Sequence, residues 1–163
     1  MTSRIFFSAI LFVLACGGLA QADRTHVAIA ANFTDAANEI ARAFAAETGH
    51  QAVLSFGATG QLFAQITQGA PFEVFLSADN VRPAMAVAEG YGVEGGVFTY
   101  AIGQLVLYSP DAAVVTGPEV LKEGNFQQIA LANPEAAPYG KAAVETMQSL
   151  GVYEALQPKM VQG

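Results

Sequence analysis

The sequence predicts an α/β protein in which short parallel strands alternate with helices. Three observations predict this class. Short apolar runs are each followed by an amphipathic helical pattern, the helical patterns end in glycine, and this unit recurs along the chain. Strands that alternate with helices are typical of a parallel sheet covered by helices on both faces.

The first unit lies at residues 26–49. The run HVAIAA at 26–31 reads as a buried strand, and the residues after it form a helical pattern. Ala37 and Ile40 recur at helical spacing on one face of that pattern, and Gly49 follows it as a stop. We therefore expect a strand, a short corner and a helix in this order.

The second and the last units follow the same plan. Residues 52–56 form a short apolar run that leads into a helical pattern ending at Gly69. Residues 129–133 form the strand of the last unit, and its helix ends at Gly151. No finished element is expected after Pro158.

The stretch between these units adds two more strands. Residues 72–90 contain a strand and a helix, with Asp79 or Asn80 as the helix cap and Pro83 in the first turn. Residues 103–109, GQLVLYS, read as a long strand that passes from one lobe of the protein to another.

The N-terminus has the layout of a secretory signal peptide. Arg4 precedes an apolar stretch over residues 5–15, and small residues lead up to a cleavage site after Ala22. The apolar stretch is too short for a spanning helix. An alternative uses Cys16, because VLAC weakly resembles the cleavage box of a lipid-anchored protein.

Composition excludes several classes of function. The chain carries 14 acidic and 7 basic residues, a net charge of −7, which argues against nucleic acid or an anionic membrane as a partner. The sequence has a single cysteine, its histidines lack metal-ligand spacing, and it contains no phosphate-binding loop or nucleophile elbow. We therefore expect neither an enzyme nor a bound cofactor.

Neutral hydrogen-bond donors stand where strands meet helices. In open α/β sheets, ligands bind outside the carboxyl ends of the strands, where helix N-termini present free N–H groups and partial positive charge. Asn32, Thr59 and Tyr139 lie at three such corners, and Lys141 is the one basic residue beside them. This pattern predicts an anion site built from neutral donors.

Each of these residues also has a purely structural interpretation. Asn32 is a good helix cap, with Asp35 three residues later, and Thr59 is an equally good cap for the second helix. Tyr139 before Gly140 is also typical of a surface turn. The sequence alone leaves these alternatives open.

Five segments together resemble the periplasmic molybdate-binding proteins of ABC transporters. The resemblance covers nearly the whole chain after the predicted signal peptide, in order, and its most specific parts are GAPFEVFLSAD and the PYG corner. The segments are AANFTDA, FGATGQLFAQITQGAPFEVFLSADN, FTYAIGQLVLYSPD, IALANPEAAPYGKAA and LQPKMVQG. The resemblance implies a two-lobed periplasmic-binding-protein-like fold of type II. Each lobe would be an α/β sheet, and the oxyanion would be enclosed between the lobes.

The resemblance also implies the residues of the site. Side chains of Asn32 and Thr59 contact the oxyanion from the first lobe, and the backbone N–H of Tyr139 contacts it from the second. Ala31 and Ala58, next to the first two, add backbone N–H donors. All of these are contacts to oxyanion oxygens, with no direct metal ligation and no cofactor.

The implied organisation is a signal peptide over 1–22, a first lobe over 23–100 and part of a second lobe over 101–163, with its continuation beyond Gly163. The implied function is capture of molybdate, and also tungstate, by a monomer in the periplasm, and delivery to an inner-membrane ABC permease. Two alternatives remain. One is a receptor for sulfate or another tetrahedral oxyanion, and the other is an extracytoplasmic sensor or adhesion module on the same scaffold.

Overall fold

The fold is that of a computed structural model, which describes residues 22–163. The predicted signal peptide, apart from Ala22, and the alternative lipid anchor at Cys16 lie outside the described residues. Within the described part, no helix is both long enough and apolar enough to cross a membrane.

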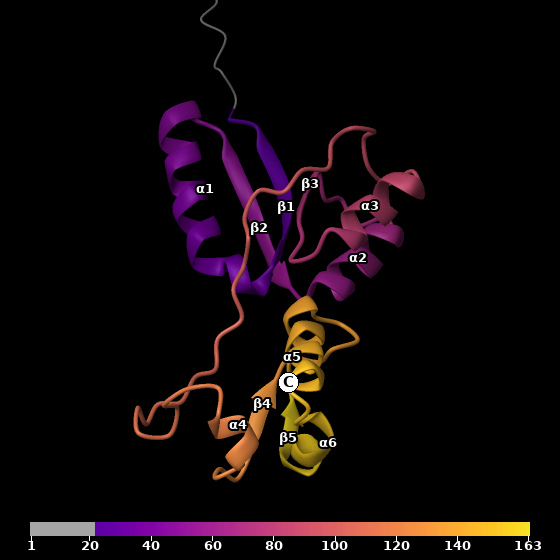
Figure 1. Ribbon diagram of the computed structural model, residues 1–163. Coiled ribbons are helices and arrows are strands. Elements are labelled where there is room, and N and C mark those ends of the chain that lie inside the picture. Colours follow the sequence, from indigo (N-terminus) through magenta and orange to yellow (C-terminus); the bar gives the residue numbers. More distant parts are fainter. Residues whose placement is uncertain (1–21) are drawn as a thin grey trace, which may run out of the picture.

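The first sheet has three parallel strands, in the order β2-β1-β3. They are β1 (Arg24–Ala30), β2 (Gln51–Gly57) and β3 (Val74–Leu76), and β1 pairs with both neighbours. The predicted parallel sheet is therefore confirmed. Because the strands run in one direction, their carboxyl ends meet at one edge, which points toward the C-terminal part of the chain (Figure 1).

Three helices accompany this sheet, with α1 on one side and α2 and α3 on the other (Figure 1). A short 3-10 turn, η1 (Ala31–Phe33), leads into α1 (Thr34–Thr48), and α2 (Thr59–Thr67) and α3 (Val81–Ala88) each follow a strand. Gly49 ends α1 in the left-handed conformation, φ 75°, as the sequence predicts. The buried residues Val27, Ile29 and Ala37 pack together between α1 and the strands.

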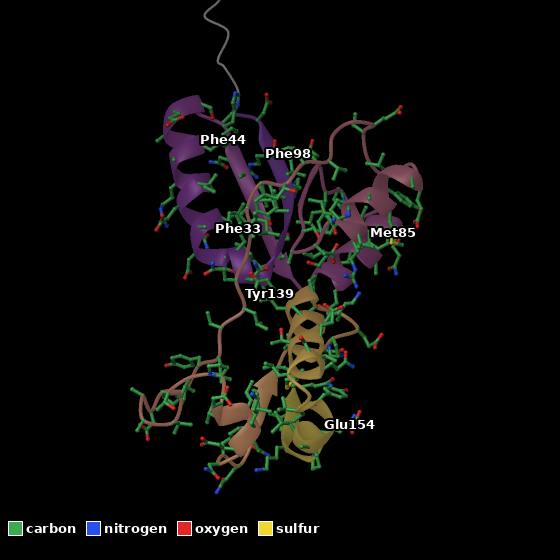
Figure 2. The ribbon with its side chains drawn as sticks, in the orientation of Figure 1. Phe33, Phe44, Met85, Phe98, Tyr139 and Glu154 are labelled. Atoms are coloured by element: carbon green, nitrogen blue, oxygen red, sulfur yellow. The ribbon has the colours of Figure 1, made fainter. Side chains whose placement is uncertain are left out.

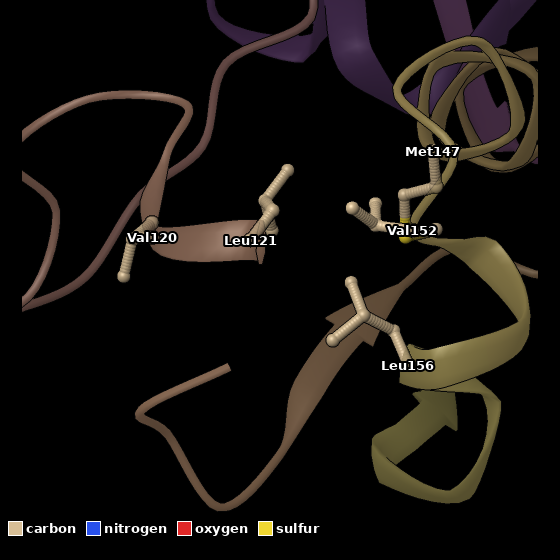
Figure 3. Packing of buried hydrophobic residues seen from close by; sticks show 5 residues of the cluster. All are labelled: Val120, Leu121, Met147, Val152 and Leu156. Atoms are coloured by element: carbon tan, nitrogen blue, oxygen red, sulfur yellow. The ribbon is translucent and has the colours of Figure 1, made fainter. Parts of the chain in front are cut away.

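A second, two-stranded parallel sheet is formed by β4 (Ile129–Leu131) and β5 (Met160–Gln162). The helices of this part are α4 (Val120–Glu123), α5 (Pro138–Ser149) and α6 (Tyr153–Leu156), followed by the 3-10 turn η2 (Gln157–Lys159). One apolar cluster joins them, as Figure 3 shows. Its buried members are Val120, Leu121, Met147, Val152 and Leu156.

Two predictions about secondary structure are wrong. Residues 103–109 form no strand, because no strand of the described residues pairs with them; Val106 and Tyr108 in this segment are 76% and 79% exposed. Conversely, Met160–Gln162 form β5, where no element was expected. That strand forms because Ile129 and Leu131 offer it a parallel ladder, which local sequence does not reveal.

Candidate functional site

The candidate site lies where the first sheet meets the N-terminus of α5 (Figures 1 and 2). Ala30 pairs with Gly57 at the ends of β1 and β2, and Asn32 and Thr59 each follow two residues later. The loop before α5 reaches this edge, since Gly60 N–H donates to the Ala136 carbonyl at 2.9 Å.

Tyr139 is the second residue of α5, directly after Pro138. Its backbone N–H has no hydrogen-bond acceptor among residues 22–163, as expected of a donor in the first turn of a helix. The side chain extends toward the first sheet, where the Asn32 amide nitrogen donates to the Tyr139 hydroxyl at 3.5 Å (Figure 2). The surface-turn alternative for Tyr139 is therefore wrong.

Asn32 does not cap α1. It sits inside η1, the cap position belongs to Phe33, and no side chain caps the helix there. The corner is held instead by the Thr34 hydroxyl, which donates to the Ala31 carbonyl at 2.7 Å. The 3-10 turn places Asn32 two residues ahead of α1, where its exposed amide donates to the Tyr139 hydroxyl.

Thr59 does not act as a cap either, because the cap position of α2 is Ala58. The Thr59 side chain is buried, with 1% of its surface exposed, and its hydroxyl oxygen accepts the Ala78 N–H at 3.1 Å. This contact uses the oxygen as acceptor and leaves the hydroxyl proton available to donate. Ala31 lies exposed in η1, beside Asn32.

Asn32 and Tyr139 line one cavity of about 810 Å³, whereas Thr59 is not among its lining residues. The structure thus brings all three predicted residues to one edge of the sheet, but at different depths. The basic residue beside them, Lys141, is 70% exposed and pairs with Glu145 at 3.8 Å. Among the described residues, no group of acidic, histidine or cysteine side chains could hold a metal ion.

Two glycines permit close contacts around the start of α5. A side chain at Gly103 would collide with the Tyr139 hydroxyl, and one at Gly140 would collide with the Ala132 carbonyl at the end of β4. The glycine of the PYG corner therefore lets α5 start close against its own strand. Gly103 lies in the irregular segment that sequence reasoning assigned to a strand, so this role was missed.

Tyr100 is a further residue that sequence reasoning missed. Its hydroxyl donates to the Ser77 carbonyl at 2.9 Å, and its ring meets Phe33 edge-on at 5.2 Å. Burial raises the pKa of the Tyr100 phenol above its ordinary 10.0, and the neighbouring Tyr139 raises that pKa further. Tyr100 therefore stays a neutral donor that ties the segment after α3 to the end of β3.

Tyr100→Phe is expected to lower the free energy of unfolding by about 1 kcal/mol near neutral pH, because one hydrogen bond is lost. The folded protein holds the Tyr100 proton above pH 10.0, where the unfolded chain releases it, so stability falls as pH rises past that value. The variant should show a shallower fall. Urea unfolding at about pH 8 and about pH 10.5 tests this, with Tyr108→Phe, at an exposed position, as the control. An equally steep fall in Tyr100→Phe would contradict the assignment.

Comparisons with known proteins find similar sequences. The chain is 50% identical over 162 residues to the molybdate-binding protein ModA of Rhodobacter capsulatus, and 46% identical to that of Azotobacter vinelandii. Both alignments cover 99% of this chain, which spans 64% of the length of these relatives.

A solved structure is similar as well. The periplasmic molybdate-binding protein of Azotobacter vinelandii superposes with a TM-score of 0.83 at 39% identity, over 85% of this chain and 62% of the other. Residues 25–163 match the family of bacterial extracellular solute-binding proteins. With that match and this α/β architecture, the chain belongs to the bacterial extracellular solute-binding proteins.

Proposed function

We propose that this protein captures molybdate, and also tungstate, outside the cytoplasm and delivers it to an ABC permease. The observation that carries the proposal is the unpaired backbone N–H of Tyr139, which stands at the N-terminus of α5 opposite the ends of β1 and β2. The relatives named above as molybdate-binding proteins support the choice of anion.

The chemistry of the donors supports an oxyanion. Asn32 offers an amide, Thr59 offers a hydroxyl whose oxygen is already engaged by Ala78, and Tyr139 offers a backbone N–H. Hydrogen bonds from neutral donors stabilise the anion without a permanent countercharge. Ala31 and Ala58 are proposed to add backbone N–H donors beside the first two residues.

The rest of the assignment rests on the same proposal. Residues 23–100 would form the first lobe and residues 101–163 part of the second, after a signal peptide over 1–22. The protein would act in the periplasm as a monomer, without catalytic activity. Closure of the two lobes would exclude water from the anion and strengthen each donor contact.

Calorimetric titration of the protein with molybdate, tungstate and sulfate tests the proposal. We expect molybdate and tungstate to bind more tightly than sulfate, by at least about tenfold, or roughly 1.4 kcal/mol. Sulfate binding as tight as molybdate binding would favour a receptor for a smaller tetrahedral oxyanion. Failure to bind any of the three anions would contradict the proposed function itself.

A further inference from the structure

A second set of contacts joins the two sheets, away from Tyr139. The loop before α5 presents two successive backbone carbonyls to the first sheet's helices. Gly60 N–H, in the first turn of α2, donates to the Ala136 carbonyl at 2.9 Å. The guanidinium of Arg82, in α3, reaches the Glu135 carbonyl with Nη2 at 3.4 Å.

The loop is held in shape by its own hydrogen bonds. The Asn133 side chain accepts the Glu135 N–H at 2.9 Å, and the Asn133 carbonyl accepts the Ala137 N–H at 2.8 Å. These bonds turn the chain between β4 and α5 and leave the carbonyls of Glu135 and Ala136 free to accept from the other sheet's helices.

Arg82 is held in place by Asp79. Its Nη1 lies 2.5 Å from Asp79 Oδ2, and Asp79 Oδ1 accepts the Arg82 backbone N–H at 2.9 Å. The two side chains are 25% and 16% exposed, so the pair is partly shielded from water. This pairing fixes the planar guanidinium and leaves Nη2 for the Glu135 carbonyl.

The contact depends on the absence of a side chain at Gly60. A Cβ there would lie 3.0 Å from the Ala136 carbonyl oxygen and 3.2 Å from Arg82 Nη2. Either the lobes would separate slightly or both groups would have to shift. A glycine in the first turn of a helix costs helix stability relative to alanine, which suggests that close approach is what it serves here.

We propose that Gly60 and Arg82 form a closure clasp, defined as these two donors with the carbonyls of Glu135 and Ala136. The clasp rests on the proposed function: it holds the lobes closed over the oxyanion and slows the anion's departure. Neither residue needs to touch the anion. The loop that accepts these hydrogen bonds leads directly into Pro138 and Tyr139. The contacts therefore also hold the Tyr139 N–H in position.

Gly60→Ala and Arg82→Gln test the clasp by stopped-flow measurement of molybdate association and dissociation. We expect dissociation to be about five- to tenfold faster in each variant, with a smaller change in association, because contacts made on closure act mainly on the off-rate. Thermal unfolding without anion checks that Gly60→Ala still folds, as expected because alanine favours the helix. Arg42→Gln, the same change at an exposed position on α1, should leave both rates unaltered.

A measurement that needs no anion separates this proposal from the proposed function. Spin labels at Glu39→Cys and Gln148→Cys, both exposed on helices of different sheets, report the distance between the lobes. Gly60→Ala should reduce the population at the short distance, with or without molybdate. If the parent protein binds no oxyanion, the proposed function fails, and these distances still test the clasp independently. The clasp would be overturned if both variants showed the same distances as the parent protein. It would also be overturned if the protein binds molybdate and both variants release it at the parent rate.

Discussion

Gly140→Ala is expected to lower molybdate affinity by roughly one hundredfold and the free energy of unfolding by about 1–3 kcal/mol or more. The new Cβ would collide with the Ala132 carbonyl oxygen and lie 2.9 Å from the Asn133 carbonyl carbon. Both are backbone atoms at the end of β4, which no rotamer change moves aside. The start of α5 must therefore shift, and the Tyr139 N–H shifts with it.

Calorimetry and thermal unfolding, measured on the same samples, check this expectation. Gly117→Ala is the matched control, because a Cβ at that position would meet nothing within 4 Å. The control should bind and melt like the parent protein. A Gly140→Ala protein that lost stability but retained the parent affinity would contradict Tyr139 as a ligand, and one that retained both would show that the corner accommodates a Cβ.

Thr59→Val is expected to weaken molybdate binding by one to two decades, because a hydrogen bond to a charged group contributes roughly 1.5–3 kcal/mol. Valine keeps the shape of threonine and removes the hydroxyl. The structure adds a second effect: the Ala78 N–H loses its acceptor at 3.1 Å. Leaving that group unsatisfied costs about 1–3 kcal/mol of stability.

The two effects are separated by measuring affinity and unfolding together. Thr59→Ser, which keeps the hydroxyl, should retain most of the affinity and the bond from Ala78. A Thr59→Val protein that loses stability but binds molybdate with an unchanged dissociation constant would mean that Thr59 serves only to anchor the loop after β3.

Much of the architecture follows from the sequence alone. The alternation of apolar runs with amphipathic patterns predicts the strands β1, β2, β3 and β4 and the longer helices after them, and Gly49 marks a helix end because only glycine adopts its φ of 75° without strain. Parallel strands bring their carboxyl ends to one edge. Residues that follow those strands, Asn32 and Thr59, were therefore predictable neighbours.

The exact roles at that edge were decided by tertiary structure. Whether Thr59 caps its own helix or accepts the Ala78 N–H depends on where the loop after β3 lies. The hydrogen bond from Gly60 N–H to the Ala136 carbonyl forms only because the fold brings together two segments that are far apart in the sequence. Residues 103–109 have the composition of a strand but no partner among the described residues, while Met160–Gln162 gain one in β4. Periodicity and capping are local properties, which sequence records directly. Which strands pair, and which acceptors the N–H donors find, depends on groups that are distant in the sequence. Only the folded chain brings those groups together.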